Sequence, residues 1–130
     1  YWEGHDYIGL GPGAHSRLRF DGDIYAIYQI YNPKKWLNSV TKRGHGTAKS
    51  QILSLHARGQ ELIMLGLRTP KGIKISRLES QTTKKIGNFF NLMEYDNLIK
   101  NGFLQNSGGH IRATLSGRMC LNMVLQKLMA

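Results

Sequence analysis

The sequence of 130 residues is poor in cysteine and has no long apolar run. Cys120 is the only cysteine, which excludes an intramolecular disulfide, and we interpret its thiol as a buried, inert group on an apolar helix face. No apolar run approaches the roughly 18 residues of a membrane span, and no basic, apolar leader is present. These absences predict a chain without a membrane span and a cytoplasmic location.

Acidic side chains are also scarce, at eight against 18 Lys and Arg, which gives a net charge of +10. The excess lies after residue 32, because residues 33–130 carry 16 basic and four acidic side chains, a balance of +12. Such an excess can attract nucleic acid, anionic lipid or an acidic ligand, or it can form a solvated surface that only aids solubility. Charge alone does not choose between these.

Patterns of metal ligands and catalytic residues are missing as well. The histidines stand apart, at positions 5, 15, 45, 56 and 110. No pair has the spacing of a zinc site, so we predict no metal site. Ser16, His15 and Asp6 are the residue types of a catalytic triad, but no nucleophile-elbow sequence surrounds Ser16, and we interpret this segment as a polar loop.

The first part of the chain predicts mainly extended structure. Residues 7–10 have the pattern of a short buried strand, and apolar alternation in 17–20 and 24–30 around Asp21-Gly22-Asp23 predicts a β-hairpin. Asn32-Pro33 then offers an N-cap followed by proline at the first helical position. We therefore expect a short helix from Lys34 to about Lys42.

The rest of the chain predicts alternating helices and short strands. We expect an amphipathic helix from Thr47, broken or bent near Gly59, and then an extended piece at 73–75. The apolar residues Ile86, Phe89, Phe90 and Leu92 predict a second helix, and a third should end at Asn101-Gly102. A hairpin of 103–105 with 110–113 and a last helix capped by Thr114 should follow. The fold class is therefore α+β. From about residue 47, the order of elements is that of a winged-helix-type domain.

One glycine-rich segment could serve a ligand. The stretch D-Y-I-G-L-G-P-G-A-H-S, residues 6–16, places glycines at every second position behind an apolar run. Glycine lets backbone amides approach a ligand closely, and it also supplies the left-handed conformations of tight turns. The spacing is not that of the common dinucleotide fingerprint, so a plain turn and a ligand cradle both remain open.

Several motifs in a fixed order carry a resemblance over nearly the whole chain. They are Tyr1-Trp2, D-Y-I-G-L-G-P-G-A-H-S, E-L-I-M-L-G-L-R at 61–68, L-I-K-N-G-F-L at 98–104 and T-L-S-G-R-M-C-L-N at 114–122. This set resembles the C-terminal third of the radical-SAM proteins called oxygen-independent coproporphyrinogen III oxidase-like, and most of all their haem-chaperone branch. We therefore expect a piece of a longer protein, a view that the start at Tyr1 also favours.

The resemblance implies a division into two parts. Residues 1–46 would be the remnant of a radical-SAM partial barrel, a strand plus β-hairpin with a linking helix, and residues 47–130 would form the winged-helix-like C-terminal domain. The missing N-terminal domain of the parent would be the partner, and the C-terminal domain would cover the cofactor and tetrapyrrole site. The exposed surface that faces the barrel would then allow self-association.

The resemblance also implies cofactors in the parent. A C-x-x-x-C-x-x-C loop there holds a 4Fe-4S cluster at which S-adenosyl-L-methionine is cleaved. With Cys120 alone this chain cannot hold such a cluster, so we predict that it has no cofactor and no catalytic residue of its own and is inert by itself. Carried over residue by residue, Gly11, Gly13, Ala14 and His15 would line the S-adenosylmethionine pocket of the full-length protein.

A second motif of the chaperone branch, H-N-x-x-Y-W, is associated with haem binding. This chain retains only Tyr1 and Trp2 of that motif, so we do not expect haem attachment through it here. The choice between oxidase and haem chaperone stays open, and part of the positive charge could face the propionates of a tetrapyrrole. The alternative from another class is a winged-helix nucleic-acid-binding module, which we regard as the weaker interpretation because the last helix is largely apolar.

Overall fold

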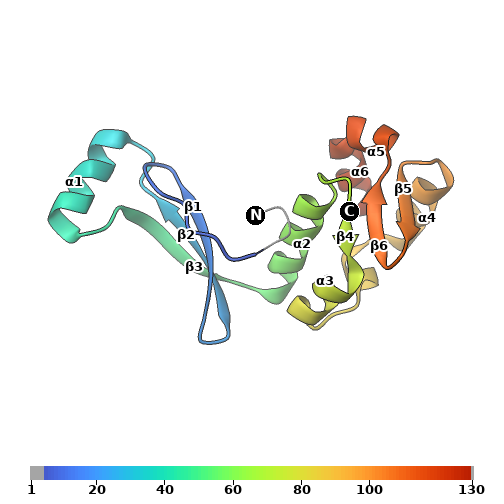
Figure 1. The fold of residues 1–130 in the computed structure, drawn as a ribbon, viewed down its shortest axis with the longest axis horizontal. Helices are drawn as coiled ribbons and strands as arrows, with labels where there is room; N and C mark the ends of the chain where they lie inside the picture. Colours follow the sequence, from blue (N-terminus) through green and yellow to red (C-terminus); the bar gives the residue numbers. More distant parts are fainter. Residues whose placement is uncertain (1–4, 130) are drawn as a thin grey trace. The chain divides into compact units, whose positions relative to one another are not determined.

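A computed structural model describes residues 5–129 of the chain (Figure 1). The described residues separate into two compact units, with the division between Ser54 and Leu55. The first unit holds a three-stranded sheet and one helix, and the second holds another small three-stranded sheet and the remaining helices. The predicted α+β class is confirmed.

The first unit is built on an antiparallel sheet of order β1-β2-β3. Its elements are β1 (His15–Phe20), β2 (Asp23–Gln29), α1 (Pro33–Arg43) and β3 (Thr47–Leu53). Asp21 and Gly22 both adopt positive φ, at 53° and 84°, which is the conformation that a two-residue hairpin turn requires. The predicted first hairpin is confirmed.

Helix α1 begins and ends as its sequence predicts. The Asn32 side chain accepts a hydrogen bond from the Lys35 amide, Pro33 occupies the first turn, and Gly44 closes the helix at a φ of 79°. None of its side chains is buried. The indole of Trp36 donates to Gln29 Oε1 over 3.0 Å, which ties the helix to β2.

Two predictions in the first unit are wrong. Residues 7–10 do not form a strand, since only Tyr7 makes a β-bridge, to Arg17. The expected helix from Thr47 is replaced over 47–53 by β3, which pairs with β2 along its length. The sequence T-A-K-S-Q-I-L has no strand alternation of its own, so this pairing, which residues distant in sequence supply, decides its conformation.

The second unit surrounds an antiparallel sheet of order β4-β6-β5 with helices. Its elements are α2 (Leu55–Gly66), β4 (Ile73–Lys74), α3 (Ile75–Thr82), the 3₁₀ turn η1 (Ile86–Phe89), α4 (Leu92–Lys100), β5 (Leu104–Ser107), β6 (His110–Ala113), α5 (Leu115–Met119) and α6 (Leu121–Leu128). The second hairpin, β5–β6, and the cap by Thr114, which accepts from the Gly117 amide, are confirmed.

Local differences from the predictions have packing causes. Helix α2 is continuous through Gly59, where the missing side chain makes room for the ring of Phe89. The polar segment after residue 75 forms α3, for which no helix was expected, and the helix expected to enter through Ile86 is a 3₁₀ turn followed by α4. The last helix is divided at Cys120, whose φ and ψ of −127° and 43° interrupt the helical path.

The hydrophobic core of the second unit receives side chains from most of its helices and from all three strands of its sheet. The buried members are Leu62, Ile63, Leu67, Ile73, Leu78, Phe89, Leu98, Leu104, Ile111, Ala113, Val124 and Leu128. Burial on this scale supplies the main stabilisation of a small domain. Within residues 5–129, no helix has the length and apolar character needed to cross a bilayer.

Candidate functional site

The glycine-rich segment leads directly into β1. Gly11 and Gly13 have positive φ, at 95° and 70°, so both occupy conformations that other residues resist. The Gly13 amide donates to the Ile30 carbonyl over 2.9 Å, and the Gln29 amide donates to the Ala14 carbonyl over 2.8 Å. Backbone bonds to the end of β2 therefore hold the segment in place.

The side chains beside these glycines are engaged with the first unit itself. The exposed His15 ring lies edge-on to Tyr28, with the ring centroids 4.7 Å apart. Ser16 Oγ accepts from the Gly9 amide, and Asp6 Oδ2 accepts from the Arg19 amide. These two bonds give Ser16 and Asp6 structural roles in ordering the segment.

The predicted haem residues cannot be placed, because Tyr1 and Trp2 lie outside the described residues. The four residues expected to line an S-adenosylmethionine pocket, Gly11, Gly13, Ala14 and His15, are contiguous with the glycine turn and the start of β1. Gly13 is favoured by its φ of 70°, since the nearest obstacle to an added Cβ is the ring of Tyr31, an exposed side chain that can move aside. Fold requirements thus account for the glycines, and their ligand role stays a prediction.

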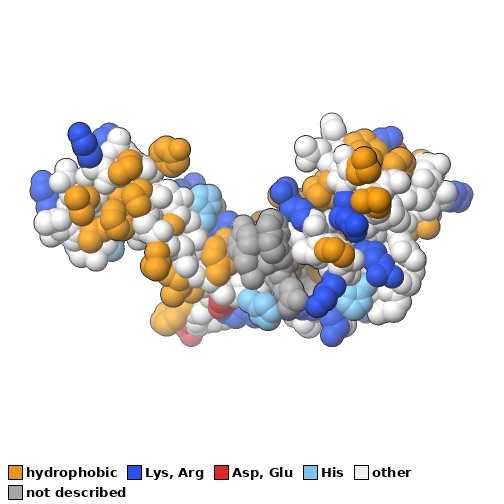
Figure 2. Space-filling view, turned by 45° about the horizontal axis from the view of Figure 1, so that its top comes forward, with side chains coloured by type: hydrophobic (Ala, Val, Ile, Leu, Met, Phe, Trp, Pro, Cys, Tyr) orange, Lys and Arg blue, Asp and Glu red, His pale blue; other side chains and the backbone are white. Residues whose placement is uncertain are grey.

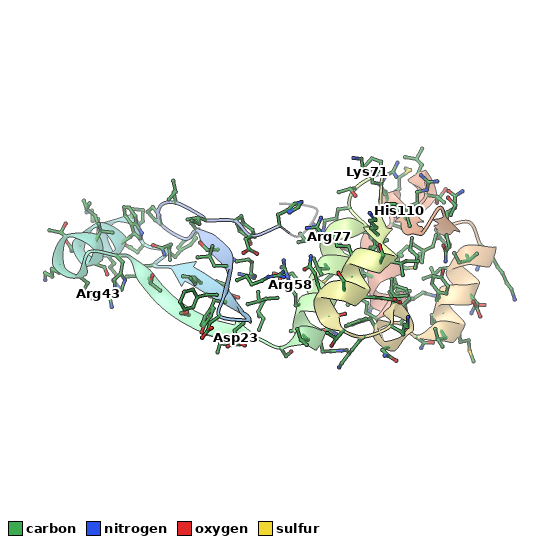
Figure 3. The ribbon with its side chains drawn as sticks, turned by 60° about the horizontal axis from the view of Figure 1, so that its bottom comes forward. Asp23, Arg43, Arg58, Lys71, Arg77 and His110 are labelled. Carbon is green, nitrogen blue, oxygen red and sulfur yellow. The ribbon has the colours of Figure 1, made fainter. Side chains whose placement is uncertain are left out.

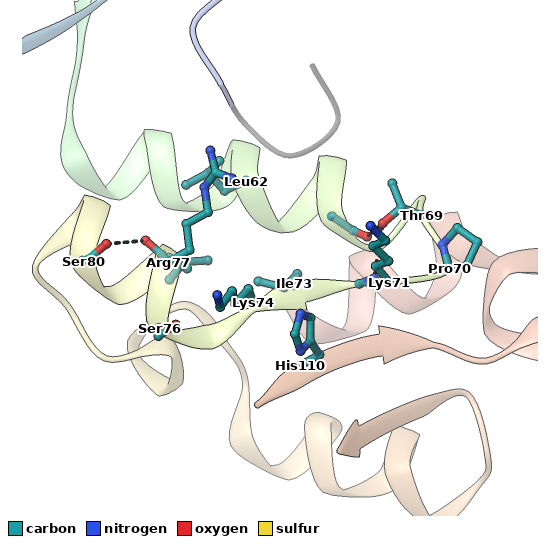
Figure 4. Close-up of a pocket in the computed structure, with 13 residues that line it drawn as sticks. Leu62, Thr69, Pro70, Lys71, Ile73, Lys74, Ser76, Arg77, Ser80 and His110 are labelled. Carbon is teal, nitrogen blue, oxygen red and sulfur yellow. Dashed lines mark hydrogen bonds between the residues drawn. The ribbon is translucent and has the colours of Figure 1, made fainter. Parts of the chain in front are cut away.

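A pocket of about 850 Å³ opens in the second unit (Figure 4). Its walls come from the end of α2, the loop 69–72, β4, the start of α3 and the first residue of β6. Its volume falls in the range of small-molecule and cofactor sites, roughly 300–1,000 Å³. All of these walls belong to one compact unit.

The pocket combines an apolar floor with a basic rim. Leu62, Ile73 and Leu78 are buried core residues that also line the pocket. Lys71 and Lys74 are exposed at its edge, and neither has an ion-pair partner among the described residues. No described residue that lines the pocket is acidic.

Further polar groups line the same pocket. Arg77, from the first turns of α3, and His110, from β6, are both half-buried. Lys71, Arg77 and His110 are labelled in Figure 3, where they come from three different segments of the second unit. Lys and Arg side chains also gather over this unit on the face shown in Figure 2.

His110 has a defined hydrogen-bonding arrangement. Its Nδ1 lies 3.1 Å from the Gly108 carbonyl oxygen. A carbonyl oxygen can only accept, so Nδ1 carries the proton in this bond and Nε2 of the neutral ring keeps its lone pair. The backbone of His110 is held from both sides, because β6 pairs with Lys74 of β4 and with Ser107 of β5.

Sequence reasoning missed this pocket, although one signal was available. Lys71, Lys74 and Arg77 recur at every third position after the Thr69-Pro70 turn. The spacing crosses a loop, a strand and a helix, so no single periodicity predicts that the three side chains share a site. His110 is distant in sequence and joins them only through the pairing of β4 with β6.

Comparison with known proteins gives the chain its relatives. Residues 53–120 match the family described as the HemN C-terminal domain. Radical S-adenosyl methionine domain-containing protein 1, mitochondrial, is 40% identical over 77 residues in Danio rerio, covering 56% of this chain and 17% of that protein. Its Dictyostelium discoideum counterpart is 26% identical and covers 99% of this chain and 33% of that protein.

A haem chaperone and a solved structure extend the comparison. Heme chaperone HemW of Bacillus subtilis is 23% identical, over 95% of this chain and 31% of its own length. The fold matches that of coproporphyrinogen III oxidase (HemN) from Escherichia coli, a radical SAM enzyme, with a TM-score of 0.65 at 20% identity, over 93% of this chain and 27% of that one.

The relatives are much longer than this chain, which spans between about a sixth and a third of their length. The family match runs from the last residue of β3 to the junction between α5 and α6, and so takes in the whole sheet of the second unit and its pocket. The resemblance that the motifs carry is therefore confirmed, and the chain belongs to the HemN C-terminal domain family.

Proposed function

We propose that this chain is the C-terminal part of a radical-SAM protein of porphyrin and haem metabolism, either a haem chaperone or a coproporphyrinogen oxidase-like enzyme. The family match over residues 53–120 is the observation that carries the proposal. Relatives named as a radical-SAM protein and as a haem chaperone align with nearly all of this chain through about a third of their own length.

The two units would have different roles in the parent. The first unit, with the glycine segment, would complete the edge of the radical-SAM barrel, and Gly11, Gly13, Ala14 and His15 would line the S-adenosylmethionine pocket. The backbone-anchored turn and the exposed His15 ring support this assignment. The second unit would be a winged-helix-like cover, which the order α2, β4, α3, α4, β5, β6 supports.

The 4Fe-4S cluster that such a parent needs does not fit the donors of this chain. Three cysteine thiolates are required from the protein, and Cys120 is the only cysteine. The thiol of the half-buried Cys120, at the break between α5 and α6, donates to the Ser116 carbonyl over 3.1 Å. We therefore assign the cluster to the missing radical-SAM portion and expect this chain to be inert alone.

In the parent, the second unit would act by covering the reacting centre. A cover excludes water from a radical intermediate and strengthens polar contacts to a bound tetrapyrrole. Its apolar-floored, basic-rimmed pocket supports contact with an acidic ligand. The cytoplasmic location stays a prediction, because the relatives from Danio rerio and Dictyostelium discoideum are named as mitochondrial.

A chimera tests the proposal. This chain replaces the matching C-terminal third of the Bacillus subtilis haem chaperone, and the truncated chaperone without that third serves as the control. The chimera is expected to bind and cleave S-adenosylmethionine with its cluster in place, whereas the truncated control loses binding. His15→Ala in the chimera should weaken S-adenosylmethionine binding, and His45→Ala, at an exposed position, should not.

Two results would contradict the proposal. If the chimera binds and cleaves S-adenosylmethionine no better than the truncated control, the proposed role of this chain in the parent is wrong. Tight, steeply salt-dependent binding of duplex DNA by the 130-residue chain would instead support the alternative of a nucleic-acid-binding module.

A further inference from the structure

We propose that the pocket of the second unit is a haem-docking site, with His110 as the ligand of the iron and Lys71 and Lys74 as partners of the propionates. The choice of a tetrapyrrole rests on the proposed function, whereas the site itself rests on the geometry of this chain. Its residues differ from Tyr1 and Trp2, the two residues of this chain that belong to the haem motif of the family.

The size and polarity of the pocket fit a large amphiphilic ligand. Its volume is about 850 Å³, and its floor consists of the buried side chains Leu62, Ile73 and Leu78. A tetrapyrrole has an apolar ring with carboxylates gathered at one edge. Leu62, Ile73 and Leu78 are at most 8% exposed, so the favourable contribution of the ring is limited to the apolar area of the whole lining that it removes from water.

The basic rim fits the carboxylate edge. Lys71 and Lys74 stand in the loop and in β4, at the border of the pocket (Figure 4). Neither has a carboxylate partner among the described residues, so their charges remain available to a ligand. Since no described acidic residue lines the pocket, a dianionic ligand meets attraction without local repulsion.

His110 supplies the specific feature that a merely anionic site lacks. Histidines that ligate metals usually donate the other ring N–H to a carboxylate or a backbone carbonyl, which fixes the tautomer and the ring orientation. His110 has this arrangement already, through its Nδ1 contact of 3.1 Å to the Gly108 carbonyl. Its Nε2 lone pair can therefore enter the coordination sphere of ferric haem, with no proton displaced and no electron transferred.

The experiment is a set of titrations of the 130-residue chain with ferric haem, metal-free protoporphyrin IX and protoporphyrin dimethyl ester, which lacks the carboxylate charges. Binding is followed by the Soret absorption and by porphyrin fluorescence, at low and at high salt. The variants are His110→Gln and the double variant Lys71→Gln/Lys74→Gln. Their matched controls are His56→Gln and Lys84→Gln/Lys127→Gln, exposed positions of the same unit.

The lysine double variant should weaken both acidic ligands by about tenfold, as expected for two partly exposed ion pairs, and should remove most of their salt dependence. The dimethyl ester should be unaffected by that change. His110→Gln should shift the Soret band of ferric haem and weaken ferric haem by at least about tenfold, while protoporphyrin IX stays within about twofold. The control variants should match the parent chain.

Equal binding of ferric haem by the parent chain and by both pocket variants would overturn the proposal, as would the absence of saturable binding. Circular dichroism spectra establish that each variant is folded. The chimera described above reports separately on the proposed function. If the chimera cleaves S-adenosylmethionine but the 130-residue chain does not bind haem, the proposed docking site is wrong and the proposed function still stands.

Discussion

The two units differ in how much of their apolar surface they bury for themselves. Among the described residues of the first unit, the buried hydrophobic ones are Ile24 and Ala26, and helix α1 buries no side chain. Among those of the second unit, twelve buried hydrophobic residues form a continuous core. Leu10 and Phe20 of the first unit are 89% and 71% exposed.

The difference indicates that the two units are stabilised in different ways. The second unit has a continuous hydrophobic core, whereas the first relies on backbone pairing and buries few apolar side chains. A first unit of this kind is consistent with a proposed role at the edge of a larger barrel. The comparison can be tested at several positions, beginning with the largest expected effect.

Separating the units should have the largest effect. We expect residues 55–130 alone to unfold cooperatively and residues 1–54 alone to lack a cooperative transition, because nearly all of the core belongs to the second unit. Thermal unfolding followed by circular dichroism, together with the dispersion of amide signals in NMR spectra, measures this. A cooperative transition of residues 1–54 would contradict the comparison.

Gly59→Ala should destabilise the second unit by about 2 kcal/mol, because the added Cβ meets the Phe89 ring. The clash must outweigh the gain of about 1 kcal/mol that alanine brings to a helix. Phe89→Leu removes the ring edge, so the double variant should lose less than the sum of the single losses. Urea unfolding measures each value, and Met64→Ala, at an exposed position on the same helix, should stay within about 0.5 kcal/mol.

Removing helix caps should have smaller effects that differ between the units. Thr114 Oγ1 accepts from the Gly117 amide over 3.2 Å and donates to the Gly102 carbonyl over 2.5 Å, so Thr114→Ala should lose about 1–2 kcal/mol. Asn32→Ala should lose about 1 kcal/mol, and only from α1.

Hydrogen exchange distinguishes the two cap variants. Thr114→Ala should lower protection across the second unit, whereas Asn32→Ala should lower it only in α1, because that helix buries no side chain. Thr114→Ser keeps the hydroxyl and serves as the control. Uniform loss of protection in Asn32→Ala would show that the first unit is more cooperative than its core suggests.

The smallest expected effect concerns self-association through exposed apolar side chains. Leu10→Ser and Phe20→Ser together should weaken dimer formation by less than about 1 kcal/mol, because only weak contacts form without the missing partner surface. Light scattering over a range of concentrations measures this. Leu92→Ser and Met93→Ser are the matched change in the second unit. An equal effect of that change would show that association does not depend specifically on Leu10 and Phe20.

Local signals predicted the parts of the fold that short segments decide. Asn32-Pro33 and Gly44 fixed the ends of α1, and Asp21-Gly22 fixed the first hairpin, because capping and turn chemistry act within a few residues. Residues 47–53 were mistaken for helix because their strand conformation depends on β2, which lies 20 residues or more away in sequence for most of the pairs. Local preference does not carry that information.

The candidate site was harder to predict for the same reason. The glycine turn at 11–13 is one contiguous segment, so its conformational role could be anticipated, whereas its ligand role depends on walls that the resemblance alone implies. Leu62 and His110 line the same pocket although they are far apart in sequence, because the core packing and the sheet order β4-β6-β5 bring their elements together. Each of its residues taken alone is typical of a core or of a solvated surface.

The central position of β6 has one further consequence. A side chain on a loop can adopt many positions around its backbone, and a ligand that binds it must restrict all of them. The imidazole of His110 stands on a strand that is paired along both edges, so only the rotations of the side chain itself are left to restrict. In the proposed docking site, the backbone that carries His110 would therefore add little to the entropy that binding has to offset.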